Sequence, residues 1–118
     1  MTAKLENEYG VISIDHEVIA RIAGYAAIEC YGIVGMAAKN VKDGPVQLLK
    51  LESLTKGIKM QVNANRVSLD LHIIVEYGTN ISAIADNIVS TVKYSVEEYT
   101  GLAVDDVNIF VDGVRVDG

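Results

Sequence analysis

The clearest pattern in the chain is a strict alternation of apolar and polar residues from 58 to 77. This period of two indicates two strands, each with one buried and one solvated face. Asn65-Arg66 fits a two-residue hairpin loop, because Asn tolerates the positive φ that such turns need. The loop predicts a register with Met60 opposite Leu71. The apolar residues of both strands then share one face: Ile58, Met60, Val62, Ala64, Val67, Leu69, Leu71, Ile73 and Val75.

Two longer segments, 15–31 and 80–100, show the helical period instead. Asp15 is expected to cap the first helix, which ends near Tyr31, and Gly101 is expected to end the second in the left-handed conformation. Each segment has one apolar stripe that can face a sheet. The stripe positions are Val18, Ile19, Ile22, Ala23, Ala26 and Cys30 in the first, and Ile81, Ile84, Ala85, Ile88, Val92, Val96 and Tyr99 in the second.

Shorter apolar runs predict three more strands, at 11–14, 33–36 and 107–111. The segment 38–57 holds an Asp-Gly-Pro breaker and a leucine-rich stretch that could form a short helix from Pro45. The order of elements predicts an α+β fold: a two-layer sandwich in which two long helices pack on one face of a mixed, mainly antiparallel sheet. The 118 residues suit a single domain, 1–118.

Charge and cysteine usage limit the partners and the compartment. The net charge is -6, and residues 97–118 hold six acidic residues against one arginine. This field repels phosphate, so a protein partner is expected rather than nucleic acid or anionic lipid. Cys30 is the only cysteine, which rules out an intramolecular disulfide and fits the reducing cytosol. No apolar run approaches the ~20 residues that span a bilayer, so we expect a cytoplasmic protein that reaches a membrane only through a partner.

The segment Gly32-Ile33-Val34-Gly35 has the G-x-x-G spacing of KH-type nucleic-acid clamps. Such a clamp joins two helices and lies near basic residues. Here the inserted pair is apolar, and the pattern predicts a helix stop followed by a strand. A KH-like nucleic-acid binder is therefore the least favoured alternative.

A search for chemistry predicts no catalytic, cofactor-binding or metal site. His16 and His72 are far apart in the sequence and lie in no metal-ligand spacing, and Cys30 falls on the apolar stripe of its helix. Asp105-Asp106 and Asp112-Gly113 lack calcium-loop spacing and are interpreted as turn residues flanking a strand. No Walker loop, dinucleotide fingerprint or G-x-S-x-G motif is present.

A protein-interaction surface is the remaining candidate site. Ile74 and Phe110 break the polar alternation of their strands and point toward the solvated face, while Tyr94 lies on the polar side of the second helix. If Ile74 and Phe110 meet, they form the apolar centre of a patch. Its expected rim is Asp70, His72 and Asn108.

Three segments carry a family resemblance: "YGVISIDHEVIARIAGYAAIECYGIVGM", "GIKMQVNANRVSLDLHIIVEYG" and "VEEYTGLAVDDVNIFVDGV". Together, over residues 9–114, they resemble the alkaline-shock or Gls-type general stress protein family of Gram-positive bacteria. The resemblance implies a non-enzymatic cytoplasmic protein of the envelope stress response that acts at the membrane through an anchor protein.

The compact length is similar to a short branch of that family, often encoded beside a fatty-acid kinase. This likeness implies the alternative of an accessory partner of a lipid-metabolic kinase. Self-association as a homo-oligomer also stays open.

Overall fold

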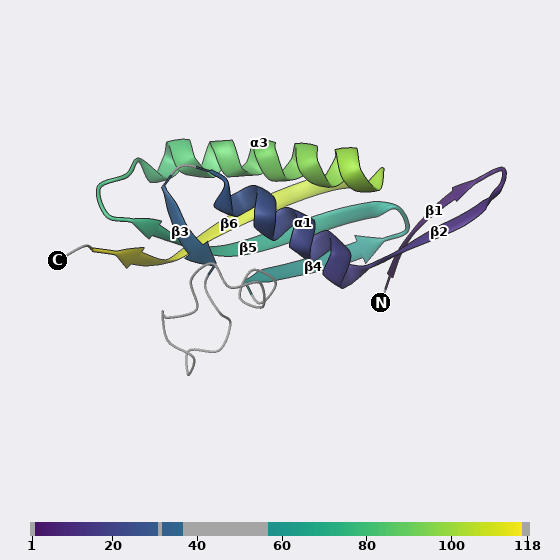
Figure 1. Cartoon of the computed structure of the whole chain (residues 1–118), viewed down its shortest axis with the longest axis horizontal. Helices are drawn as coiled ribbons and strands as arrows, with labels where there is room; N and C mark the ends of the chain where they lie inside the picture. Colours follow the sequence, from purple (N-terminus) through teal and green to yellow (C-terminus); the bar gives the residue numbers. More distant parts are fainter. Residues whose placement is uncertain (1, 31, 37–56, 117–118) are drawn as a thin grey trace.

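The strand β5 (Arg66–Glu76) forms the centre of the main sheet in the computed structural model, which describes residues 2–30, 32–36 and 57–116. The helix predicted from Pro45 lies outside these residues. Figure 1 shows the arrangement. The other elements, in chain order, are β1 (Thr2–Asn7), β2 (Gly10–Asp15), α1 (His16–Ile28), β3 (Ile33–Met36), β4 (Ile58–Asn63), α3 (Ile81–Thr100) and β6 (Ala103–Arg115).

One edge of β5 is shared by two antiparallel strands. β4 pairs with its first half and β3 with its last residues. The other edge pairs in parallel with β6. Parallel neighbours need a crossover, and α3 supplies it between β5 and β6. The prediction of a mixed, mainly antiparallel sheet is confirmed.

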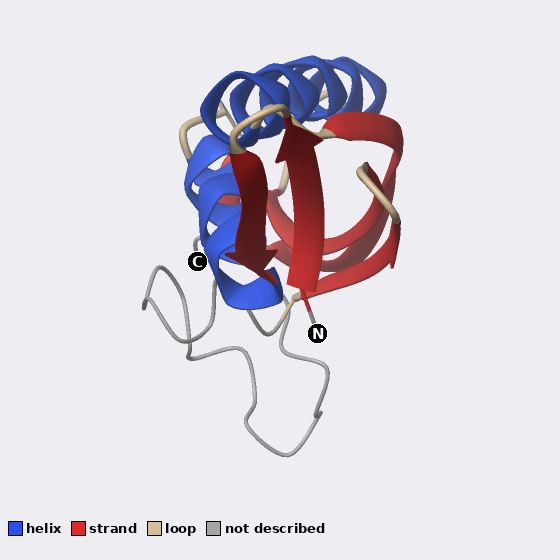
Figure 2. Ribbon diagram, turned by 90° about the vertical axis from the view of Figure 1, so that its right-hand side faces the viewer, coloured by secondary structure: helices blue, strands red, loops and turns tan. Residues whose placement is uncertain are grey.

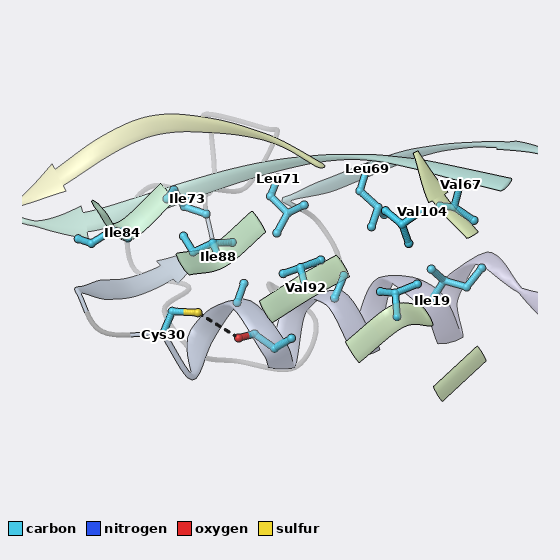
Figure 3. Packing of buried hydrophobic residues seen from close by; sticks show 14 of the residues in the cluster. Ile19, Cys30, Val67, Leu69, Leu71, Ile73, Ile84, Ile88, Val92 and Val104 are labelled. Carbon is cyan, nitrogen blue, oxygen red and sulfur yellow. Dashed lines mark hydrogen bonds between the residues drawn. The ribbon is translucent and has the colours of Figure 1, made fainter. Parts of the chain in front are cut away.

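Both helices cover the same face of the main sheet (Figure 2). Odd-numbered residues of β5 point inward, so Leu69, Leu71 and Ile73 are fully buried and face Ile88 and Val92 of α3 (Figure 3). Burial of such a side chain stabilises the fold by about 1.5–3 kcal/mol. We call the opposite side of the sheet the outer face. Its residues on β5 and β6 are Ser68, Asp70, His72, Ile74, Asp106, Asn108 and Phe110.

A capping side chain begins each of the two helices, and the one at Asp15 confirms the prediction. The Glu17 N–H donates to the Asp15 carboxylate (3.2 Å), and the Ala83 N–H donates to the Asn80 side chain (3.1 Å). Gly101 ends α3 with φ +78°, in the left-handed region that favours glycine. α1 ends at Ile28, one turn earlier than predicted.

The β4–β5 turn lies one residue earlier than predicted. Asn63 pairs with Arg66, so Ala64 and Asn65 form the loop, and it is Ala64 that has the positive φ of 59°. Met60 therefore pairs with Leu69 rather than Leu71. A period of two determines which face a residue occupies but not its partner, so this slip leaves the core face unchanged. Arg66 stays in the strand, where it contacts Asp105 of β6.

The sequence patterns missed the first strand. β1 and β2 form a separate antiparallel hairpin that projects from one end of the molecule (Figure 1). Leu5 is the apolar residue of β1 that packs against the core. A polar segment with a single apolar residue shows no alternation of apolar and polar positions, so the sequence pattern did not predict this strand.

The last strand is longer than predicted, and it contains the acidic residues that were interpreted as turns. Its register with β5 shifts twice, once between Val104 and Asp106 and once between Val111 and Gly113. Asp105 and Asp112 are the extra residues, each the centre of a β-bulge. A bulge bends a strand without ending it, so polar residues at these positions did not require turns.

Candidate functional site

The outer face contains two of the three residues predicted for the interaction surface. Phe110 pairs in register with His72, and the two rings stack with centroids 4.8 Å apart and an angle of 14° between their planes. Ile74 lies on the same face, two residues further along β5. Phe110 remains 43% exposed despite the stacking, so an aromatic surface is presented to solvent.

Ile74 is half-buried, although no large side chain flanks it on the neighbouring strands. It pairs with Gly35 of β3 on one side and with Gly113 of β6 on the other. A Cβ placed on Gly113 would lie 3.6 Å from the Ile74 side chain, so Ile74 lies directly over that glycine. Gly113 thus leaves room for the Ile74 side chain above it.

Each bulge places a carboxylate beside a nitrogen-bearing side chain of β5. The Asp112 Oδ2 atom lies 2.8 Å from His72 Nδ1, and the Arg66 Nε–H donates to Asp105 Oδ1 over 2.7 Å. The hydrogen bond with Asp105 raises the pKa of the exposed Arg66 guanidinium, which is already protonated at physiological pH. The His72–Asp112 contact holds the imidazole in place beneath Phe110.

The residues expected to form the polar rim, Asp70, His72 and Asn108, all lie on the outer face. The Asn108 Nδ2–H donates to Asp70 Oδ1 over 2.9 Å. His72 pairs with Phe110, and its backbone N–H donates to the Gly57 carbonyl; it does not lie opposite Lys59 as predicted. Next to the rim is an open hollow of about 580 Å³. It is lined by Ile58, Lys59, Met60, Gln61, Ser68, Asp70, Asp106 and Asn108.

Tyr94 does not belong to this surface. It is 67% exposed on α3, whereas Val92 and Val96 of the same helix are fully buried against the sheet. Tyr94 therefore points away from the sheet, on the opposite side of the molecule from Ile74 and Phe110. The structure thus divides the three predicted residues into an outer-face pair and a separate helix-surface tyrosine.

The G-x-x-G segment adopts the predicted helix stop followed by a strand. Gly32 has φ +91°, and Gly35 pairs with Ile74 within β3. A Cβ on Gly32 would lie 2.3 Å from the Ile84 side chain. Close packing against α3 and the positive φ account for this glycine.

Among the titratable groups considered for chemistry, His72 contacts Asp112, whereas His16 and Cys30 lie at opposite ends of α1. Cys30 is buried, and burial raises the pKa of its thiol, which keeps it protonated and unreactive. His16 begins α1 and is half-buried. Within residues 2–30, 32–36 and 57–116, no three His, Cys, Asp or Glu side chains are grouped to hold a metal ion.

Sequence reasoning missed the two bulges and the His72–Asp112 contact. Both depend on the parallel register of β5 and β6, strands separated by the whole of α3. The only available signal was the pair of acidic sites spaced seven residues apart, at Asp105 and Asp112, and turn residues explained these equally well.

These elements define a small α+β domain with two helices on one face of its main sheet and an open polar-aromatic face on the other. Residues 4–116 match the model of the alkaline-shock protein 23 family, which is described as having a "cell envelope-related function". The chain belongs to this family, which confirms the alkaline-shock resemblance.

Relatives of similar length include YloU, an uncharacterized protein of Bacillus subtilis strain 168, which is 50% identical over 98% of both chains. Another is Spy1614 of Streptococcus pyogenes serotype M6, 36% identical over 100% of this chain and 98% of that protein. A stress response regulator gls24 homolog of S. pyogenes serotype M3 is 32% identical; the match covers 90% of this chain and 59% of the homolog.

Among solved structures, a nickel form of MamM CTD is similar with a TM-score of 0.50 and 12% sequence identity, over 86% of this chain and 99% of that one. At this identity the likeness shows the fold alone. Among the described residues, no helix combines the length and apolar character needed to span a bilayer.

Proposed function

We propose that this protein is a non-enzymatic, cytoplasmic component of a stress response linked to the cell envelope, and that it acts by binding a protein partner through its outer face. Membership of a cell envelope-related family and similarity to stress response regulator homologs support the biological setting. The observation that carries the mode of action is Phe110: an aromatic ring held by His72, yet 43% exposed at the centre of a polar rim. Interface anchors have this arrangement.

The proposed partner is a membrane anchor protein, which would bring this chain to the envelope. A second candidate is a lipid-metabolic kinase, with this chain as its accessory partner. The match to YloU over 98% of both chains, against 59% of the gls24 homolog, favours the short family branch to which that alternative belongs.

Affinity capture from a native lysate tests this proposal with wild-type protein and the Phe110→Ser variant. Tyr94→Ser is the matched control, because it removes a more exposed aromatic ring from the opposite side of the molecule. Circular dichroism first confirms that all three proteins are folded. We expect Phe110→Ser to lose a partner that wild type and Tyr94→Ser retain.

The identity of the lost partner separates the two candidates. A membrane protein supports the stress-linked anchor, and a kinase supports the accessory role. An unchanged partner list in Phe110→Ser contradicts the outer face as the binding surface.

A further inference from the structure

The second edge of β6 is open over most of its length. In the part of the chain that the structure describes, β6 pairs with β5 alone. Alternate residues of a strand direct their N–H and C=O groups to opposite edges, so half of the backbone groups of β6 face away from β5. One of its amides is capped: the Val104 N–H donates to the Glu97 carboxylate over 3.0 Å. An open edge of this kind is a template for another strand.

The two bulges limit how much of this edge can pair. They lie at Asp105 and Asp112 and bracket the regular stretch Asp106–Val111. Bulges interrupt the ladder and bend the strand, so they protect an edge from long edge-to-edge contacts. The net charge of -6 also repels a second copy of the chain. The stretch Asp106–Val111 thus fits a short extended segment of a different, basic chain.

The outer-face side chains of Asp106–Val111 indicate which residues an added strand would need opposite them. The Asp106 carboxylate is exposed and makes no hydrogen bond or ion pair with any described residue. Phe110, four residues on, stacks on His72 on its β5 side and remains 43% exposed. Directly opposite side chains on adjacent strands interact, so an added strand would place one residue beside Asp106 and another beside Phe110.

We propose that the β6 edge at Asp106–Val111 binds an extended basic segment of the partner protein as an added strand. In this segment a Lys or Arg lies opposite Asp106 and an apolar residue lies opposite Phe110, on one face and four positions apart. Backbone hydrogen bonds supply the affinity, and these two side chains supply the selectivity. The proposal rests on the proposed function and names the chemistry of its partner.

A short synthetic peptide tests this surface. It alternates Thr and Val, with Lys and Ile four positions apart on one face, and is titrated at low salt into isotope-labelled full-length protein followed by NMR. We expect amide shifts concentrated at residues 106–111 and cross-strand contacts between peptide and β6. Reversing the charge with Asp106→Lys should weaken binding by about 3- to 10-fold, with a smaller effect at high salt.

Asp86→Lys is the matched control, since it makes the same charge reversal at an exposed position on α3 and should leave the affinity of the peptide unchanged. A peptide with Glu in place of Lys should bind more weakly. The proposal is overturned by shifts centred on β4 or on the β1–β2 hairpin, by equal effects of the two reversals, by equal binding of the acidic peptide, or by no binding at millimolar concentration.

The capture experiment separates failure of this proposal from failure of the proposed function. If Phe110→Ser loses a partner while the basic peptide does not bind β6, the outer face binds its partner without adding a strand. If Phe110→Ser loses nothing, the proposed function itself fails.

Discussion

At the scale of single residues, glycines allow close packing between the helices and the sheet. Gly32 and Gly78 have nearly the same positive φ, +91° and +92°. Their surroundings differ. A Cβ on Gly32 would lie 2.3 Å from the Ile84 side chain, whereas nothing lies within 4 Å of a Cβ on Gly78. Comparing an alanine substitution at each glycine therefore separates the cost of backbone strain from the cost of a packing clash.

Gly32→Ala should destabilise the protein by more than Gly78→Ala. Both substitutions cost about 1–2 kcal/mol for an alanine in the left-handed region, and only the first adds a clash at the junction of α1, β3 and α3. We expect the difference between the two free energies of unfolding, measured in urea, to be about 1–3 kcal/mol. Equal losses would show that α3 does not pack against Gly32 as described.

At the scale of elements, the sequence predicted those whose pattern is local. The alternation in β4 and β5, most of the apolar stripes of α1 and α3, and the caps Asp15 and Gly101 depend on neighbours within a few residues, and the structure contains them. Val18, Ile81 and Tyr99 are exposed, although they were expected on the stripes that face the sheet. The turn at Ala64-Asn65 depends instead on how β4 pairs with β5, and the bulges at Asp105 and Asp112 depend on how β6 aligns beside β5. A one-dimensional pattern contains no information on that alignment.

The register of β5 places Leu71 at the centre of the sheet, between Ile58 of β4 and Ile109 of β6. Leu71 is fully buried, so Leu71→Ala leaves a cavity and should cost about 2–5 kcal/mol in the free energy of unfolding. Urea denaturation gives the value. Tyr94→Ala, at an exposed position, should stay within about 0.5 kcal/mol of wild type. A Leu71→Ala loss as small as the control would contradict the placement of Leu71 in the core.

At the scale of the whole molecule, the two faces of the main sheet have different roles. One is covered by α1 and α3 and contains the core, while the outer face presents Phe110, Ile74 and their polar rim to solvent. Sequence reasoning placed Ile74 and Phe110 on that face because alternation alone determines the side of a strand. It could not find that His72 stacks on Phe110, because that contact joins two strands that α3 separates in the sequence.

The interaction role of this face is the central claim, and hydroxyl-radical footprinting in native lysate tests it most directly. Phe110 reports on the outer face, while Tyr94 and Tyr99 are exposed internal references on α3. We predict that Phe110 is oxidised more slowly in lysate than in purified protein, relative to both tyrosines. Protection of the tyrosines with Phe110 unchanged would place the interface on the helices and contradict this account.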